Sequence, residues 1–330
     1  MGSEARAAQV NEVIRRLEAH YVFPAVAAKL ADALRSRLDD GAYADVDDAE
    51  FATLVTADLQ SVNGDPHLRL RHHTDPVADD GDAAVNSDGF RIEAELEGFG
   101  VAAVRRLAGN VGYLDTTMLY PPELAGPAIS AAMTLLAPAD ALLLDVRRNR
   151  GGSPGTSALL QTYLVDEQVH YLDIYEREGD KTTQMWTLPY VPGPRFGGTK
   201  PVWVLTGPRT FSGGEDLAFS LQQQGRAKTV GEATRGGAHP REQYKVDTYL
   251  DVTVSIARSF HPETGENWEG TGVRPDLPVA ADKAFDAAYE LALRHVLELG
   301  DAGPRRGVAE EARQALDQVK DVGPGVDGTE

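Results

Sequence analysis

The spacing of apolar residues changes partway along the chain, and this change limits the fold more than any other feature. Residues 4–62 carry apolar side chains at the three- and four-residue spacing of amphipathic helices, in stretches over 10–17, 26–38 and 51–59. From about Arg91 onward, short apolar runs alternate with helical segments. The sequence therefore predicts a small helical N-terminal domain followed by a mixed α/β core.

The apolar pattern also predicts the order of elements in the second part. The predicted strands cover residues 91–96, 111–118, 141–146, 169–177, 182–188 and 202–205, with a hairpin region over 244–254. The predicted helices cover residues 126–136, 157–164, 213–223 and 283–299. Residues 71–88 are polar and without period, which is typical of a linker or loop. We expect a helical N-terminal domain (1–75), a core (76–300) and a charged, partly disordered C-terminal tail (301–330).

Charge and residue usage exclude several classes of protein. With 32 Lys and Arg against 51 Asp and Glu, the chain is an acidic protein of net charge −19, which repels nucleic-acid backbones and anionic lipid. It has no cysteine, so disulfides, thiolate zinc sites and cysteine nucleophiles are excluded. No run of about 18 apolar residues is present to span a bilayer. We expect no nucleic-acid partner, no membrane insertion and no cofactor, and a homo-oligomer is compatible with the sequence.

Two further expectations come from the N-terminal part of the chain. Residues 1–6 lack the basic, apolar and small-residue order of a secretory signal, which favours a cytoplasmic protein, with a removed leader as the alternative. His72 and His73 precede several aspartates and could suggest a metal site, but a run this polar is typical of a solvated loop. We therefore expect no metal.

The segment 207–215 joins an apolar strand to a helix and contains Ser212. A serine at a helix N-terminus lies where unpaired backbone N–H groups point outward, so the N–H of Gly213 could stabilise an oxyanion formed beside it. The alternative is that Ser212 and Glu215 form only a helix capping box, since their spacing is S-x-x-E. Both interpretations can hold in part.

A glycine-rich turn follows the predicted strand at 141–146. Gly151 and Gly152 could supply a second oxyanion donor or a docking edge for a substrate backbone, or they could form only a tight strand-to-helix turn. The pattern of a phosphate-binding loop is absent from this segment.

A serine nucleophile needs a base, and His67 is the strongest candidate of the eight histidines. It follows Gly64, Asp65 and Pro66 at a rigid junction, where a purely structural role is the alternative. Glu269 lies beside Trp268 and before Gly270, where it could orient an imidazole or be an exposed turn carboxylate.

Taken together, five segments of the chain resemble the tail-specific (C-terminal processing) serine peptidase family. The branch that they resemble contains the tricorn core and the interphotoreceptor retinoid-binding protein modules. The segments that carry the resemblance are 65–68, 145–152, 210–215, 225–238 and 270–276.

The resemblance implies a crotonase-like β-β-α spiral core behind the helical domain, with Ser212 as the nucleophile of a catalytic triad. The lysine base of the Ser-Lys branch is absent, because Gly237 occupies the matching position. The tricorn-like pattern instead implies His67 as general base and Glu269 as its supporting carboxylate, although Pro66 stands where that pattern has a serine. Too few residues separate His67 from the first core strands for an inserted PDZ domain.

The resemblance implies a serine protease, a hydrolase that cleaves peptide or peptide-like substrates through an acyl-enzyme. Two alternatives stay open: a hydrophobic, retinoid-like ligand-binding module with a vestigial site, and a specialised cytoplasmic hydrolase or cyclase acting on a small peptide or natural product. A pure carrier has no chemical reason to keep Ser212, His67 and Glu269 together, which favours the enzyme.

Overall fold

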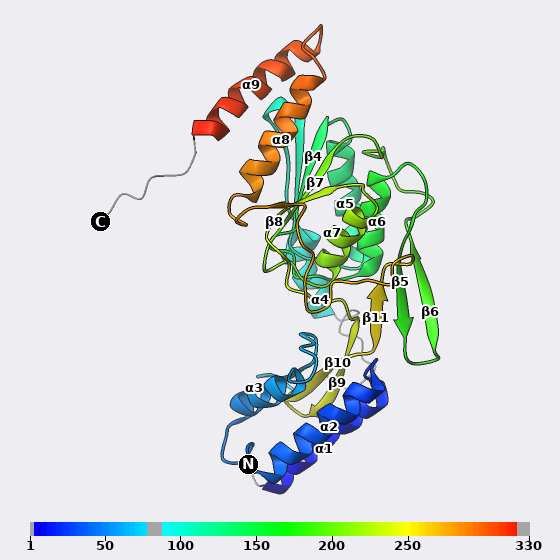
Figure 1. Cartoon of the computed structure of the whole chain (residues 1–330), viewed down its shortest axis with the longest axis vertical. Coiled ribbons are helices and arrows are strands. Elements are labelled where there is room, and N and C mark those ends of the chain that lie inside the picture. The colour runs from blue at the N-terminus through cyan, green and yellow to red at the C-terminus, as the bar shows by residue number, and fades with distance from the viewer. Residues whose placement is uncertain (1–2, 78–87, 322–330) are drawn as a thin grey trace, which may run out of the picture. The chain divides into compact units, whose positions relative to one another are not determined.

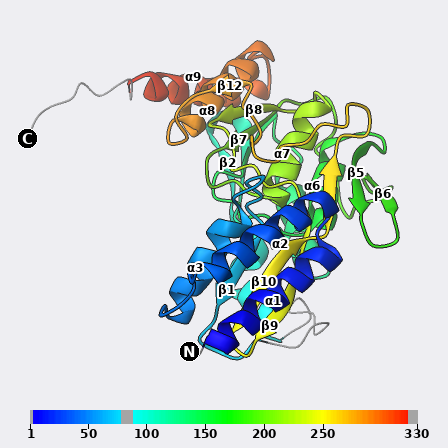
Figure 2. The same cartoon turned by 60° about the horizontal axis from the view of Figure 1, so that its bottom comes forward.

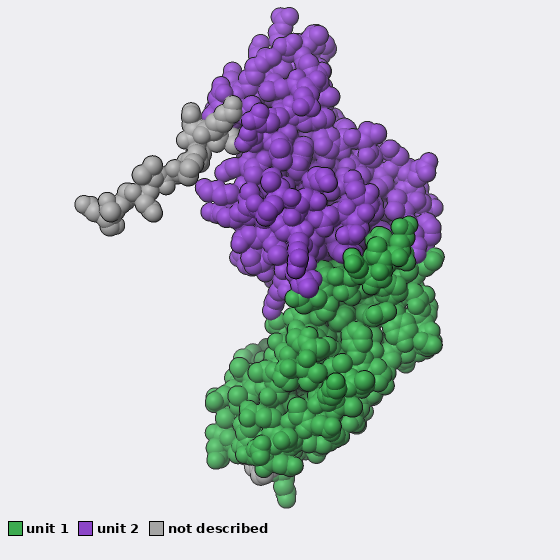
Figure 3. All heavy atoms as spheres, viewed as in Figure 1, with its two compact units in different colours: residues 1–91, 172–185, 236–270 green, residues 92–171, 186–235, 271–330 purple. Residues whose placement is uncertain are grey.

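The computed structural model describes residues 3–77 and 88–321 (Figure 1). Its contacts divide the chain into two compact units that interleave along the sequence (Figure 3). Unit 1 comprises residues 1–91, 172–185 and 236–270. Unit 2 comprises residues 92–171, 186–235 and 271–330. The three domains expected from the sequence are consecutive, whereas each unit combines segments that are distant in the chain. The boundaries of those three domains stay a prediction.

Unit 1 contains the three N-terminal helices that the apolar periodicity predicted. They are α1 (Ser3–His20), α2 (Pro24–Asp39) and α3 (Asp48–Leu59). Pro24 begins α2, where its missing N–H costs nothing, and Asp47 caps α3 by accepting the N–H of Glu50 at 2.8 Å. These local signals explain why the helices begin where they do.

A three-stranded antiparallel sheet completes the core of unit 1 (Figure 2). Its strands are β1 (Arg69–His72), β10 (Leu250–Ser255) and β9 (Arg241–Asp247), in that order. Leu70 lies opposite Val252, which in turn lies opposite Tyr244, and all three side chains pack with the apolar faces of the helices. The hairpin predicted over 244–254 is therefore confirmed, and it pairs with a strand near the N-terminus.

A second three-stranded sheet has the order β11-β5-β6, with β11 antiparallel to β5. Its strands are β5 (His170–Glu176), β6 (Lys181–Trp186) and β11 (Ala257–Phe260). The sequence predicted the first two.

Unit 2 is built on a six-stranded sheet of order β12-β8-β7-β4-β3-β2. Its pairs are parallel except for β2 with β3. The strands are β2 (Val101–Leu107), β3 (Val111–Thr116), β4 (Ala141–Asp145), β7 (Val202–Thr206), β8 (Lys228–Gly231) and β12 (Leu277–Pro278). Every residue of β4 is buried, as expected for a parallel strand covered on both faces.

Helices cover both faces of this sheet (Figures 1 and 2). One face carries α5 (Pro122–Leu136), α6 (Pro154–Leu164) and α7 (Gly213–Gln223), and the other carries α8 (Ala284–Glu298). The core on the α8 side joins Leu143 of β4 and Leu205 of β7 to Ala292 and Val296 of α8. Two 3-10 turns, η2 (Gly98–Gly100) and η3 (Ala108–Asn110), flank β2. The expected mixed α/β class with a helical N-terminal region is confirmed.

One predicted strand differs from the structure. The strand predicted over 91–96 is wrong, since residues Asp88–Leu96 form helix α4. The alternation of Ile92, Ala94 and Leu96 resembles a strand, but Ile92 and Leu96 are 49% and 83% exposed, so no half-buried sheet face is formed. At the C-terminus, α9 (Arg305–Asp321) includes the weak helical pattern of residues 309–319 and packs Ala312 and Leu316 into the α8 core.

The remaining part of the predicted tail, residues 322–330, lies outside the described residues, as does 78–87 of the predicted 71–88 loop. Among the helices of residues 3–77 and 88–321, none has the length and apolar character needed to cross a bilayer.

Candidate active site

Ser212 lies at the turn between β7 and α7, in unit 2, and it is the N-cap residue of α7. Its backbone has φ 51° and ψ −118°, a left-handed conformation that is rare for a residue with a Cβ. The buried carboxylate of Glu215 accepts the Ser212 N–H at 2.8 Å and the hydroxyl of Thr234 at 2.5 Å. Glu215 therefore caps the backbone of the serine, so the capping interpretation is correct in part, and the cap fixes the turn on which Ser212 is presented.

The glycine turn after β4 lies directly against Ser212. A Cβ on Gly151 would come within 2.8 Å of the Ser212 Cβ, and a Cβ on Gly213 would come within 2.7 Å of the carbonyl oxygen of Gly152. Gly151 and Gly152 have φ values of 104° and 125°, which a residue with a side chain rarely adopts. The structure thus brings together Gly151, Gly152, Ser212 and Gly213.

The N–H groups of this cluster have different uses. That of Gly151 is donated within the turn, to Oδ1 of Asn149 at 2.9 Å, so Gly151 contributes by allowing close approach. The N–H of Gly213 belongs to the first turn of α7, where backbone donors have no partner inside the helix and the helix dipole favours negative charge. The carbonyl of Asn149 accepts the N–H of Phe211 at 3.0 Å and ties the two turns together.

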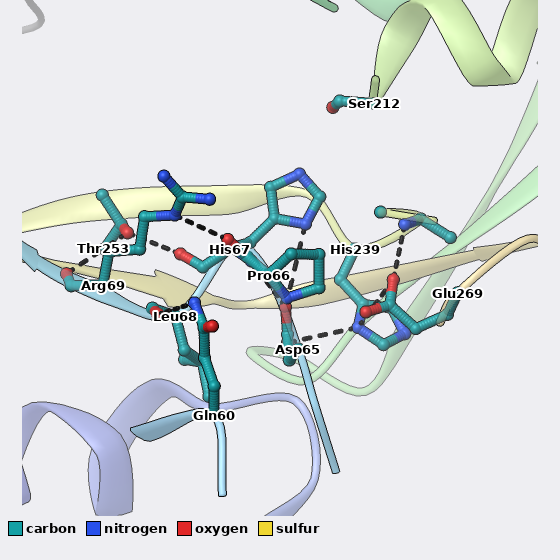
Figure 4. A network of polar contacts seen from close by, with 12 residues as sticks. Gln60, Asp65, Pro66, His67, Leu68, Arg69, Ser212, His239, Thr253 and Glu269 are labelled. Atoms are coloured by element: carbon teal, nitrogen blue, oxygen red, sulfur yellow. Dashed lines mark hydrogen bonds and ion pairs between the residues drawn. The ribbon is translucent and has the colours of Figure 1, made fainter. Parts of the chain in front are cut away.

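His67 belongs to unit 1, where it lies between α3 and β1 and is 3% exposed (Figure 4). The backbone N–H of His67 donates to Oδ1 of Asp65 at 2.9 Å, and the ring nitrogen Nδ1 of His67 lies 3.8 Å from the same oxygen. Its carbonyl accepts the hydroxyl of Thr253 on β10 at 2.5 Å. Burial lowers the pKa of His67 to about 3, opposed by the charge of Asp65, while Arg241 lowers it further. His67 is therefore an uncharged imidazole at neutral pH.

Glu269 also belongs to unit 1, next to the buried Trp268, whose Nε1 donates to the carbonyl of Gly237 at 2.8 Å. Oε2 of Glu269 accepts the N–H of Ala238 at 2.5 Å and lies 3.5 Å from Nδ1 of His239. The carboxylate of Glu269 is half-buried and held by these two neighbours. This excludes the alternative that Glu269 is a freely exposed carboxylate in a turn.

Two residues that the sequence analysis did not assign to the site connect these groups. His239 is 4% exposed, and its Nδ1 lies 3.3 Å from Oδ2 of Asp65 (Figure 4). Burial alone would raise the pKa of Asp65, but the hydrogen bond and charge of His239 and the charge of His67 hold it below its usual value. The Asp-x-His spacing was a usable signal, because an aspartate side chain commonly accepts the N–H two residues later. His239 had no comparable signal, since 174 positions separate it from Asp65.

Asp65, His239 and Glu269 are also a set that could hold a metal ion, with one ligand atom from each within 4.8 Å of the others. In contrast, His73 is paired with Asp251, which also accepts from Arg71 at 2.8 Å, so that histidine has a structural partner on β10. The expectation of no metal stays a prediction.

A serine held at positive φ on a strand-to-helix turn is the arrangement in which many α/β hydrolases expose a nucleophile. Comparison with known proteins places the chain in a family of serine peptidases. The profile of "Peptidase family S41" matches residues 110–279, just over half of the chain. That of the "N-terminal domain of Peptidase_S41 in eukaryotic IRBP" matches residues 3–94. The chain belongs to peptidase family S41, and the resemblance inferred from the five segments is confirmed.

Individual relatives are distant. The carboxy-terminal processing protease CtpB of Bacillus subtilis (strain 168) is 25% identical over 149 residues, which are 45% of this chain and 29% of CtpB. The chain thus spans less than a third of the length of that relative. A solved structure from Parabacteroides merdae ATCC 43184 has a TM-score of 0.61 at 18% identity, covering 90% of this chain and 98% of the other. The photosystem II D1 C-terminal processing protease has a TM-score of 0.53 at 15% identity, covering 92% and 100%.

Proposed function

We propose that this chain is a serine peptidase that cleaves peptide or peptide-like substrates, with Ser212 as nucleophile, His67 as general base and Glu269 as supporting carboxylate. The observation that carries the proposal is the conformation of Ser212. A left-handed backbone, a buried Glu215 cap and a facing glycine turn hold this serine at the start of α7. A structural serine has no need of this strained position.

The chemistry is acyl transfer in two halves. Oγ of Ser212 attacks the substrate carbonyl carbon while His67 accepts the hydroxyl proton, and the N–H groups of Gly213 and Gly152 stabilise the oxyanion. The C–N bond then breaks, and His67 returns the proton to the leaving amine. Water attacks the acyl-enzyme in the same way, giving a carboxylic acid and free Ser212.

The state of His67 supports this assignment. Because its pKa is lowered by burial, the ring is uncharged at neutral pH and can accept a proton. The nearby carboxylate of Asp65 favours the charged form once that proton has arrived. A base that must be neutral before the attack and charged after it needs both conditions.

Labelling with a fluorophosphonate probe, read by intact mass, tests the proposal. We expect one adduct on the wild type at neutral pH and none on Ser212→Ala or His67→Ala. The exposed residues Ser61 and His72 supply matched controls, Ser61→Ala and His72→Ala, which should label like the wild type. A folded wild type that takes no adduct would contradict the proposal and favour the carrier, which a binding screen with apolar ligands would then detect.

A further inference from the structure

The carboxylates of Asp65 and Glu269 meet at the imidazole of His239, next to His67, and the proposed mechanism gives that imidazole no role. We propose that His239 is a positioning residue: its Nδ1–H, shared between Asp65 and Glu269, holds the carboxylate of Asp65 against His67. The inference rests on the proposed function, and it assigns to Asp65 the stabilisation of the protonated His67.

The two oxygens of Asp65 have separate tasks. Oδ1 accepts the N–H of His67 at 2.9 Å and lies 3.8 Å from its Nδ1. Oδ2 accepts the hydroxyl of Tyr21 at 3.1 Å and lies 3.3 Å from Nδ1 of His239. Because Oδ2 is fixed on two donors, the carboxylate cannot rotate without losing both, and Oδ1 stays on the side of His67. At 3.8 Å the contact is too long for a hydrogen bond but short enough to stabilise a positive charge in a buried site.

The imidazole of His239 is itself fixed. Its ring packs edge-on against Phe23, with centroids 5.2 Å apart. The next residue, Pro240, accepts the N–H of Ile256 at 3.0 Å, which anchors the backbone beside the strand end. Asn63 donates to the Tyr21 hydroxyl at 2.7 Å and orients the second donor to Asp65. All the supports of Asp65 therefore come from residues whose own positions are constrained.

The position of His239 also resolves an electrostatic conflict. Nδ1 lies 3.3 Å from Asp65 and 3.5 Å from Glu269, so it stands between two acidic groups that would otherwise repel each other at low solvent exposure. A donor at this nitrogen keeps both carboxylates in place. A metal ion on the same three residues is the competing arrangement, and it predicts a different response to substitution.

Two substitutions at His239 separate positioning from simple packing. Asparagine carries its amide nitrogen close to where histidine carries Nδ1, so His239→Asn keeps the donor, whereas His239→Ala removes it. We expect His239→Ala to lower kcat by about 10- to 100-fold with KM changed little, because Asp65 and His67 lose their alignment. His239→Asn should recover most of that loss. Equal losses in both variants, or an alanine variant as active as the wild type, would overturn the proposal.

Two further readouts complete the test. Labelling of Ser212 by the fluorophosphonate probe tests the proposed function itself. An unlabelled wild type would contradict that function. A wild type and a His239→Ala variant that are labelled equally would contradict only the role of His239. A stoichiometric metal in the purified protein, whose removal by a chelator abolishes labelling, would also overturn the proposal.

Nitrogen-15 NMR of histidine-labelled wild type needs no variant to be stable. We expect His239 to carry a proton on Nδ1, and finding it as the neutral tautomer protonated on Nε2 alone would refute the shared hydrogen bond.

Discussion

Asp216 offers a quantitative test of how burial acts on the helix that presents Ser212. It lies in α7, is 4% exposed, and accepts the hydroxyl of Ser220 at 3.0 Å. Burial raises its pKa from 3.8 to about 6, while hydrogen bonds from Ser157 and Ser220 act in the opposite direction. A shift of about two units corresponds to roughly 3 kcal/mol, at 1.36 kcal/mol per unit.

The sign of the effect follows from the protons bound in each state. Between about pH 4 and 6 the folded protein holds a proton on Asp216 that the unfolded chain has lost, so the free energy of unfolding falls as the pH rises through this range. Above about pH 6, Asp216 is ionised in the folded protein as well, and the full free-energy cost of burying its charge lowers the stability. Asp216→Asn removes the ionisation, and the variant should therefore be more stable than the wild type at pH 8 by up to about 3 kcal/mol.

Urea unfolding at a series of pH values between 4 and 8 measures this difference. Other titrating groups are common to both proteins, so the difference between them isolates Asp216. We expect the free energies of unfolding of the wild type and of Asp216→Asn to be nearly equal near pH 4 and to diverge as the pH rises to 6. The exposed Asp317 provides a control, since Asp317→Asn should change the stability by no more than about 0.5 kcal/mol. A difference that is independent of pH, or a variant less stable at pH 8, would refute the reasoning.

Two more predictions concern the site. Gly151→Ala places a Cβ 2.8 Å from the Cβ of Ser212, at a backbone φ of 104°. We therefore expect the rate of probe labelling at Ser212 to fall at least about 10-fold and the free energy of unfolding to fall by about 1–3 kcal/mol. Labelling at the wild-type rate would contradict the close packing of the two turns. Because the pKa of His67 is lowered to about 3, the unfolded state binds the extra proton, and stability is lost as the pH falls from about 6.5 toward 3. His67→Gln should lack this component in acid unfolding monitored by circular dichroism, and an unchanged pH profile would show that His67 is not held uncharged.

Local pattern was enough to predict much of the fold. The apolar run 141–144 in β4 and the helical spacing in α2 and α8 each depend on residues close in sequence, and these elements were found. The same holds for Ser212 and its glycine turns, because strand-to-helix turns have a local signature. In α4 the pattern misled, since alternation alone cannot show whether a neighbouring strand exists.

The part of the site that escaped prediction depends on contacts between distant segments. Asp65 and His239 meet because β10 pairs with β1, which follows Asp65, and with β9, which follows His239. No local periodicity of these segments specifies the pairing of β10 with β1. The partner of Glu269 was expected to be His67, whereas the structure places Nδ1 of His239 at 3.5 Å from its carboxylate. A buried polar network of this kind is defined by tertiary structure.

The pairing of β1 with β10 also has a consequence for the order of events during synthesis. Arg71 contacts Asp251, 180 positions later in the chain. Helices α1, α2 and α3 leave the ribosome long before the strands that cover their apolar faces, and contacts of such long sequence separation form slowly. The apolar faces of the emerging helices therefore stay uncovered until β9 and β10 have been synthesised, and this exposure favours binding of a chaperone to the nascent chain.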